Sequence, residues 1–129
     1  MTQKEKELSL KDLCSRLPYG VKMNHIADNE HSPKTLIGIA KDMITLQGLG
    51  GYECVDVEHY KPYLFPLSSM MEEQREEYHN LCSIGTDECG DIIYFDTYES
   101  IDYLNKNKFD YRGLIPMGLA IDATGKNNY

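Results

Sequence analysis

Several features that mark common classes of protein are absent from this sequence. Tryptophan is absent, so aromatic contact surface has to come from ten tyrosines and three phenylalanines. No apolar run approaches the roughly 20 residues that a membrane-spanning helix needs. The opening residues, MTQKEKELSLKD, are charged and lack the apolar segment of a signal peptide. These absences argue against membrane insertion and export, and we predict a soluble cytoplasmic protein.

The motifs of common catalytic and phosphate-binding sites are absent as well. There is no G-x-G-x-x-G, no Gly-Lys-Ser/Thr and no G-x-S-x-G. The glycines at 48, 50 and 51 precede a strand-like segment rather than a helix, so they predict a hairpin turn. The histidines have no recognisable arrangement; they are His25, His31, His59 and His79. We therefore predict no cofactor and assign no catalytic residue.

Cysteine is present, but not in a metal-binding or disulfide pattern. The four cysteines are Cys14, Cys54, Cys82 and Cys89. Because no export signal is visible, we expect reduced thiols. His79-x-x-Cys82 together with Cys89 and His59 would supply four zinc ligands, but structural zinc sites normally contain paired knuckles. Cys82 also fits the apolar face of a predicted helix, and we predict no metal site.

Basic residues are too few to form a nucleic-acid-binding surface. The chain carries 13 Lys/Arg against 21 Asp/Glu, a net charge of −8. Residues 1–66 have eight bases and nine acids, whereas residues 67–129 have five bases and twelve acids. Between Glu72 and Asp102 there are ten acids and one base, Arg75. We expect no direct contact with nucleic acid, and any electrostatic preference should be for a basic partner.

The order of apolar patterns predicts an α+β fold, with a mostly antiparallel sheet of four to six short strands and about three helices packed on it. A chain of 129 residues is long enough for a core of its own. We expect a single globular domain over residues 9–129, preceded by a frayed segment at residues 1–8. The helices are predicted near residues 10–17, 70–82 and 97–107, with N-caps at Ser9, Ser69 and Asp96.

Strands are predicted where β-branched and aromatic residues alternate or cluster. Residues 35–46 are ambiguous between a helix and two strands, and we favour a hairpin split at Lys41-Asp42. Residues 61–68 contain two prolines, which lack the backbone N–H, and are expected at a sheet edge or in a connection. Residues 84–90 are expected to form a loop. The other strands are predicted at residues 21–26, 52–58, 91–95 and 119–121.

The segment 109–122 is densely apolar and follows the third predicted helix. Asn107 is expected to end that helix in the left-handed conformation. Pro116 disfavours a long helix through the segment, so we expect a short helical turn after Asp110 and a left-handed residue at Gly118. Exposing so many apolar side chains would be unfavourable, and the segment should therefore pack on the core.

Three motifs together resemble a known group of proteins. They are LPYG at residues 17–20, KPxLxPLS at residues 61–68 and FDxxGLIxxGLAID at residues 109–122. In this order they resemble small uncharacterised proteins encoded by phages and prophages of gut bacteria. The resemblance implies a viral or mobile-element origin, and it assigns no functional residue.

Two functions from different classes fit these patterns. The first is a non-enzymatic interaction protein of a phage or mobile element, which presents an acidic face to a host or phage protein, such as a basic nucleic-acid-handling one. The second is a small enzyme that uses a histidine and carboxylates in a cleft. An acidic face that only solubilises the protein is the simplest alternative to the first. The predicted partner-binding residues are Glu72, Glu73, Glu76, Glu77, Asp87, Glu88 and Asp91.

Overall fold

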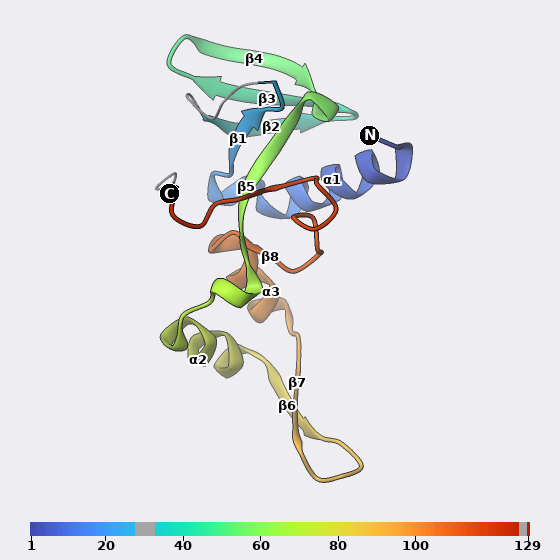
Figure 1. Cartoon of the computed structure of the whole chain (residues 1–129), viewed down its shortest axis with the longest axis vertical. Coiled ribbons are helices and arrows are strands. Elements are labelled where there is room, and N and C mark those ends of the chain that lie inside the picture. The colour runs from blue at the N-terminus through green and yellow to red at the C-terminus, as the bar shows by residue number, and fades with distance from the viewer. Residues whose placement is uncertain (28–32, 127–128) are drawn as a thin grey trace.

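The computed structural model describes residues 1–27, 33–126 and 129 and is elongated, with a β-sheet at one end and a β-hairpin at the other (Figure 1). Over those ranges it has three α-helices and a mixed, mostly antiparallel sheet of seven strands. The predicted α+β class is confirmed, but the sheet is larger than the four to six strands expected. No helix in these ranges is both long enough and apolar enough to cross a membrane.

The first helix, α1 (Gln3–Arg16), begins earlier than its predicted start near Ser9. Thr2 is its N-cap: the Thr2 hydroxyl accepts a hydrogen bond from the Glu5 backbone N–H, and the Glu5 carboxylate accepts one from the Thr2 N–H. This reciprocal pair satisfies two backbone donors that a helix start leaves free. Residues 3–8, which were expected to be frayed, therefore form the first turns of the helix.

Five strands follow one another in the first half of the chain. They are β1 (Lys22–His25), β2 (Lys34–Ala40), β3 (Met43–Gly48), β4 (Gly51–Asp56) and β5 (Tyr60–Pro66). In the sheet they lie in the order β4-β3-β2-β1-β5, and each neighbouring pair is antiparallel. The predicted hairpin over residues 35–46 and the predicted glycine turn before β4 are both confirmed.

Strand β5 lies inside the sheet, although its two prolines predicted an edge or a connection. Strand β1 pairs with Tyr60–Pro62 in antiparallel orientation, and β9 (Ile121–Asp122) and β8 (Phe109–Asp110) pair in parallel with the second half of β5. Each partner covers only a short part of β5. Neither Pro62 nor Pro66 therefore has to take part in a long hydrogen-bond ladder, and both are tolerated.

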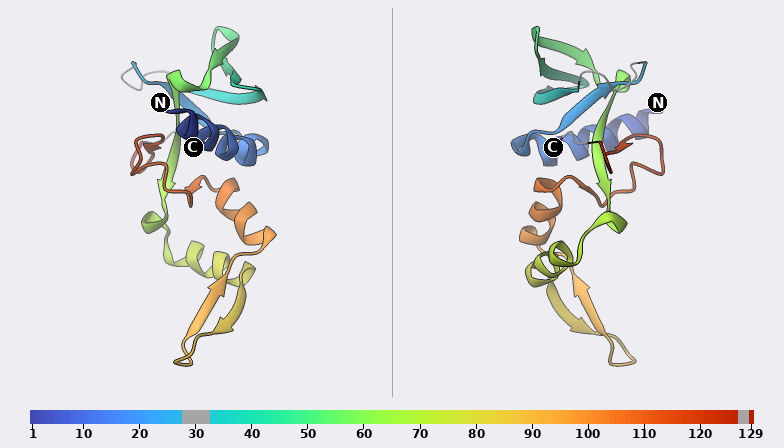
Figure 2. Two further views of the ribbon diagram at one scale, coloured as in Figure 1. Left: turned by 90° about the vertical axis from the view of Figure 1, so that its right-hand side faces the viewer. Right: turned by 60° about the vertical axis from the view of Figure 1, so that its left-hand side comes forward.

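After β5 the chain leaves the sheet and builds a projecting unit that we call the arm, residues 67–106 (Figures 1 and 2). It contains the short helix η3 (Leu67–Ser69), α2 (Glu72–Leu81), the hairpin strands β6 (Ser83–Thr86) and β7 (Ile92–Phe95), and α3 (Tyr98–Lys106). The helices begin after Met71 and Thr97 rather than Ser69 and Asp96. Part of the loop predicted at residues 84–90 is strand β6, which pairs with β7.

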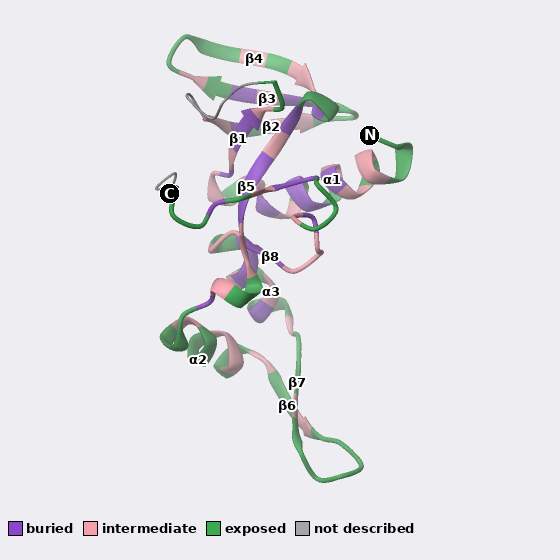
Figure 3. Cartoon of the chain, viewed as in Figure 1, coloured by how far each residue is buried: buried purple, intermediate pink, exposed green. Residues whose placement is uncertain are grey.

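Buried side chains concentrate where α1 and the C-terminal segment meet the sheet, whereas most of the arm is exposed (Figure 3). One cluster joins α1 to the sheet through Leu13, Met23 and Ile44. A smaller cluster around Met70, Leu104 and Phe109 lies at the base of the arm. No residue of α2 is fully buried: Met71 and Leu81 are exposed, whereas Tyr78 is half-buried and packs against this cluster.

The C-terminal segment packs on the core, as predicted, with Phe109, Leu114 and Leu119 buried. Residues 111–120 form turns and bends rather than the short helical turn that was expected. The Asp110 carboxylate accepts hydrogen bonds from the backbone N–H groups of Leu114 and Ile115, at 2.9 and 2.8 Å, and this fixes the turn. Gly118 has the expected left-handed conformation, and the predicted strand is the two-residue β9.

Candidate functional site

The four glutamates of α2 that were predicted to bind a partner are all exposed. Glu72 and Glu73 lie in the first turn of the helix, where its dipole stabilises negative charge. The opposite side of α2 packs on α3 through the rings of Tyr78 and Tyr103, whose centroids are 6.4 Å apart. The helix is thus held by aromatic contacts while its glutamates face solvent.

Two acids of the arm also take part in the contact between α2 and α3. The Tyr78 hydroxyl donates a hydrogen bond to Asp96, and Asp96 also accepts one from Ser100 Oγ at 3.0 Å. Burial and the nearby Glu77 carboxylate raise the pKa of Tyr103 to about 12. Glu77 therefore lies close to Tyr103 and is a poor choice for a mutation that is meant to leave the contact between α2 and α3 unchanged.

The other predicted residues lie at the tip of the β6–β7 hairpin. Asp87 Oδ1 accepts hydrogen bonds from the backbone N–H groups of Cys89 and Asp91, at 2.9 and 2.8 Å, and so organises the turn. Glu88 and Asp91 are exposed. The tip lies at the far end of the molecule, away from α2 (Figures 1 and 2). The seven predicted residues thus fall into two groups on one projecting unit.

The whole net charge of the protein resides in the arm. Residues 67–106 contain ten Asp/Glu and two Lys/Arg, while the rest of the chain contains eleven of each. The sheet, α1 and the C-terminal segment together are therefore neutral. Because charges on one small unit add, the potential near the arm is strongly negative, and it favours approach by a basic surface.

The hairpin also exposes apolar side chains, which the charge pattern alone did not reveal. Ile84 and Tyr94 face each other across the two strands, and Thr86 faces Ile92 on the same side. Ile84 is 68 % exposed and Ile92 is 64 % exposed. On the other side the Phe95 ring covers Gly85, where a Cβ atom would come 2.8 Å from Phe95 Cε2.

Nothing in the described part of the chain covers this apolar side of the hairpin beyond one ring contact with α2. The His79 ring stacks on Tyr94 with centroids 3.9 Å apart and planes within 4° of parallel. Tyr98, at the start of α3, is 92 % exposed. A sequence signal existed for this surface, since residues 92–95 read Ile-Ile-Tyr-Phe. The strand was predicted at residues 91–95, but its exposure was not, because a buried strand and an uncovered strand have the same composition.

Among the described residues, no contact of His25, His59 or His79 forms a cleft shared with carboxylates. His59 lies 3.7 Å from Glu58, and both side chains are about half exposed at the surface. His25 stacks near His59, with ring centroids 6.2 Å apart, and also contacts Tyr60. His31 lies outside the described residues. None of these contacts places an imidazole in a cavity that would hold a substrate.

The four residues that were considered as zinc ligands and rejected are His59, His79, Cys82 and Cys89. Among residues 1–27, 33–126 and 129, no group of three or more His, Cys, Asp or Glu side chains is placed to hold a metal ion. His79 is stacked on Tyr94, whereas Cys89 is at the exposed hairpin tip. Within the same ranges all four cysteines are free thiols.

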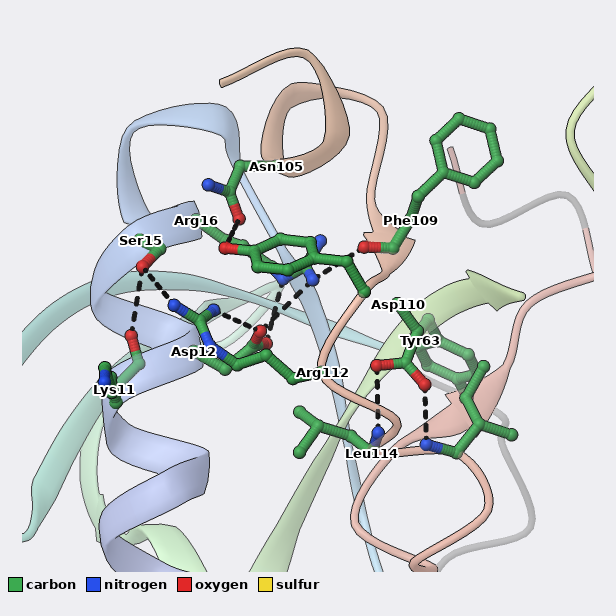
Figure 4. Close-up of polar contacts among 12 residues, drawn as sticks. Lys11, Asp12, Ser15, Arg16, Tyr63, Asn105, Phe109, Asp110, Arg112 and Leu114 are labelled. Carbon is green, nitrogen blue, oxygen red and sulfur yellow. Dashed lines mark hydrogen bonds and ion pairs between the residues drawn. The ribbon is translucent and has the colours of Figure 1, made fainter. Parts of the chain in front are cut away.

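A buried polar cluster, which the sequence did not predict, joins α1 to the C-terminal segment (Figure 4). The Asp12 carboxylate accepts hydrogen bonds from Arg16 at 2.9 and 3.1 Å and from Arg112 at 2.8 Å. Arg16 also donates to the Phe109 carbonyl at 2.7 Å, and the Tyr111 ring lies next to both guanidinium groups. Two arginines from different segments thus share one buried carboxylate.

No family model, no curated protein and no solved structure matches this chain.

Proposed function

We propose that this is a non-enzymatic interaction protein of a phage or mobile element, and that it binds a basic host or phage protein in the bacterial cytoplasm through its arm. A nucleic-acid-handling protein is a suitable partner, because its basic groove would accept the carboxylates of the arm in place of phosphates. The phage origin rests on the resemblance of the three motifs at residues 17–20, 61–68 and 109–122.

One observation carries the proposal: negative charge and uncovered apolar surface coincide on the same projecting unit. A solubilising surface requires the charge but not the exposed Ile84 and Ile92. A two-stranded hairpin alone in water is only marginally stable, and a partner that covered its apolar side would stabilise it. Apolar contacts would supply affinity, and the surrounding carboxylates would supply orientation and partner choice.

The test separates the contribution of the apolar hairpin surface to partner binding from non-specific hydrophobic binding. Tagged wild-type protein and the Ile84→Ser/Ile92→Ser variant are used to capture binding proteins from extracts of a lysogenic host. A matched control, Ile26→Ser/Ile37→Ser, removes two exposed isoleucines from the opposite end of the molecule. We expect the hairpin variant to lose a basic protein that the wild type and the control both retain.

Melting curves provide the folding check, because all four isoleucines are exposed and their replacement should leave the melting temperature nearly unchanged. The proposal is wrong if the proteins that the wild type and the control capture, and the hairpin variant loses, are acidic. It is equally wrong if the folded hairpin variant captures the same proteins in the same amounts as the wild type.

A further inference from the structure

A pocket of about 440 Å³ lies at the base of the arm, where β5, α2, β8 and the C-terminal residues meet. Its apolar walls come from Phe65, Phe109, Met71 and the Tyr129 ring. The Phe65 ring lies 6.3 Å from Phe109 and 6.0 Å from Tyr129, measured between centroids. This size and this aromatic lining are typical of sites for small organic molecules.

The charge of the pocket is opposite to that of the protein. Its lining includes Lys106 and Lys108 and no acidic side chain, in a chain whose net charge is −8. Among the described residues neither lysine forms an ion pair with a carboxylate. The Lys108 ammonium instead donates to the Lys106 carbonyl at 2.8 Å and lies 5.1 Å from the centre of the Tyr129 ring.

The backbone holds Lys108 in an unusual conformation. Its φ is +61°, in the left-handed region. The sequence pattern had predicted this conformation for the preceding residue, Asn107. A lysine there is strained, and glycine is the usual choice at this position after a helix. Burial, with the nearby charges of Arg16 and Lys106, also lowers the pKa of Lys108. The backbone strain disfavours any side chain at this position, and burial disfavours the charge of the lysine; an anion bound beside it would offset the second effect.

We propose that this pocket binds a small organic anion with a flat aromatic ring, such as an aromatic carboxylate. The ring would pack between Phe65, Phe109 and Tyr129, and the carboxylate would accept hydrogen bonds from Lys106 and Lys108. Such charge-assisted bonds are strong where the surroundings are partly dry and no competing carboxylate is present. The site is separate from the exposed side of the hairpin and does not depend on the partner proposed above.

The test uses 2-naphthoate as the probe, titrated into the full chain by calorimetry. We expect saturable binding of one molecule per chain. Lys106→Gln and Lys108→Gln should each weaken it about tenfold, the usual effect of removing one charged hydrogen-bond donor. Lys11→Gln, which removes an exposed charge on α1, should leave the affinity unchanged. Circular dichroism confirms that each variant is folded, and the exposed Lys106 provides a variant that does not strain the fold.

Two further probes separate the anion from the ring. The neutral 2-naphthamide should bind about tenfold more weakly than naphthoate, because it lacks the charge. Inorganic phosphate should bind more weakly than naphthoate, because it lacks the ring. The proposal is overturned if naphthoate shows no saturable binding, if both lysine variants bind it as tightly as the wild type, or if either comparison probe equals it.

Discussion

At the scale of single residues, the buried Asp12 carboxylate accepts hydrogen bonds from two arginines that lie in different parts of the chain. It and Arg16 are fully buried, and Arg112 reaches the same carboxylate from the C-terminal segment. Arg16 Nη1 has no hydrogen-bond partner among the described residues. Removing the Asp12 carboxylate would leave still more of this buried guanidinium without a partner. A change at Asp12 should therefore affect the whole fold rather than only one helix.

We predict that Asp12→Ala lowers the free energy of unfolding by about 3–5 kcal/mol, because it leaves Arg16 charged and buried without its carboxylate. Urea denaturation followed by circular dichroism measures this loss. Lys11→Ala, at the neighbouring exposed position, is the control and should change little. Equal stability of the two variants would contradict the role assigned to the cluster.

Tyr103 gives a prediction for alkaline pH. Its pKa is about 12, against 10.0 for the unperturbed phenol. Between these values the folded protein keeps a proton that the unfolded chain has released, so stability falls as pH rises from about 10 to about 12. Tyr103→Phe should reduce this fall, measured by urea denaturation over that pH range. Tyr98→Phe, at an exposed ring, should not; the same fall in both variants would refute the assignment.

At the scale of elements, we predict that deleting residues 109–129 unfolds the protein. The deletion removes β8 and β9 from β5 and takes Phe109, Leu114 and Leu119 out of the core. Each such side chain contributes about 1.5–3 kcal/mol, against a total stability of about 5–15 kcal/mol. The deletion also removes Arg112 from Asp12. A truncated chain that melts as cooperatively as the full chain would disprove this account.

The sequence predicted the elements that are determined by neighbouring residues and missed those that depend on distant partners. The hairpin of β2 and β3, the glycine turn at residues 48–51 and the docked C-terminal segment follow from local patterns, and all were predicted. The central place of β5 was not, because it depends on three short partners that lie far away in the sequence. Strand β6 was missed for a similar reason: its residues 83–86, Ser-Ile-Gly-Thr, have no strand pattern of their own, and the strand forms by pairing with β7.

The candidate site was predictable in part. Composition located the acidic residues between Glu72 and Asp102, and the four α2 glutamates among them are exposed in the structure. Composition could not show that the acids at the hairpin tip lie away from those on α2, because that separation depends on how far the hairpin projects. The lysine-lined pocket was not predicted, since Phe65, Lys108 and Tyr129 are brought together only by the packing of distant segments.

At the scale of the whole molecule, the protein is a neutral body that carries an acidic arm. This division implies that the position of a charge on the protein affects association with a basic partner more than the total net charge does. Glu73→Lys/Glu76→Lys on α2 and Glu7→Lys/Glu58→Lys on the body change the net charge by the same amount, and all four side chains are exposed. Comparing the two double variants therefore separates steering by the arm from a general effect of net charge.

The most direct test of the acidic-arm account is the association rate constant of the captured partner with wild type and both double variants, measured as a function of salt. At low salt, where the Debye length is about 30 Å, Glu73→Lys/Glu76→Lys should slow association at least tenfold, while Glu7→Lys/Glu58→Lys should have a much smaller effect. Added salt should bring the three rates together. Rates that are indifferent to salt, or that fall equally in both double variants, would contradict the account.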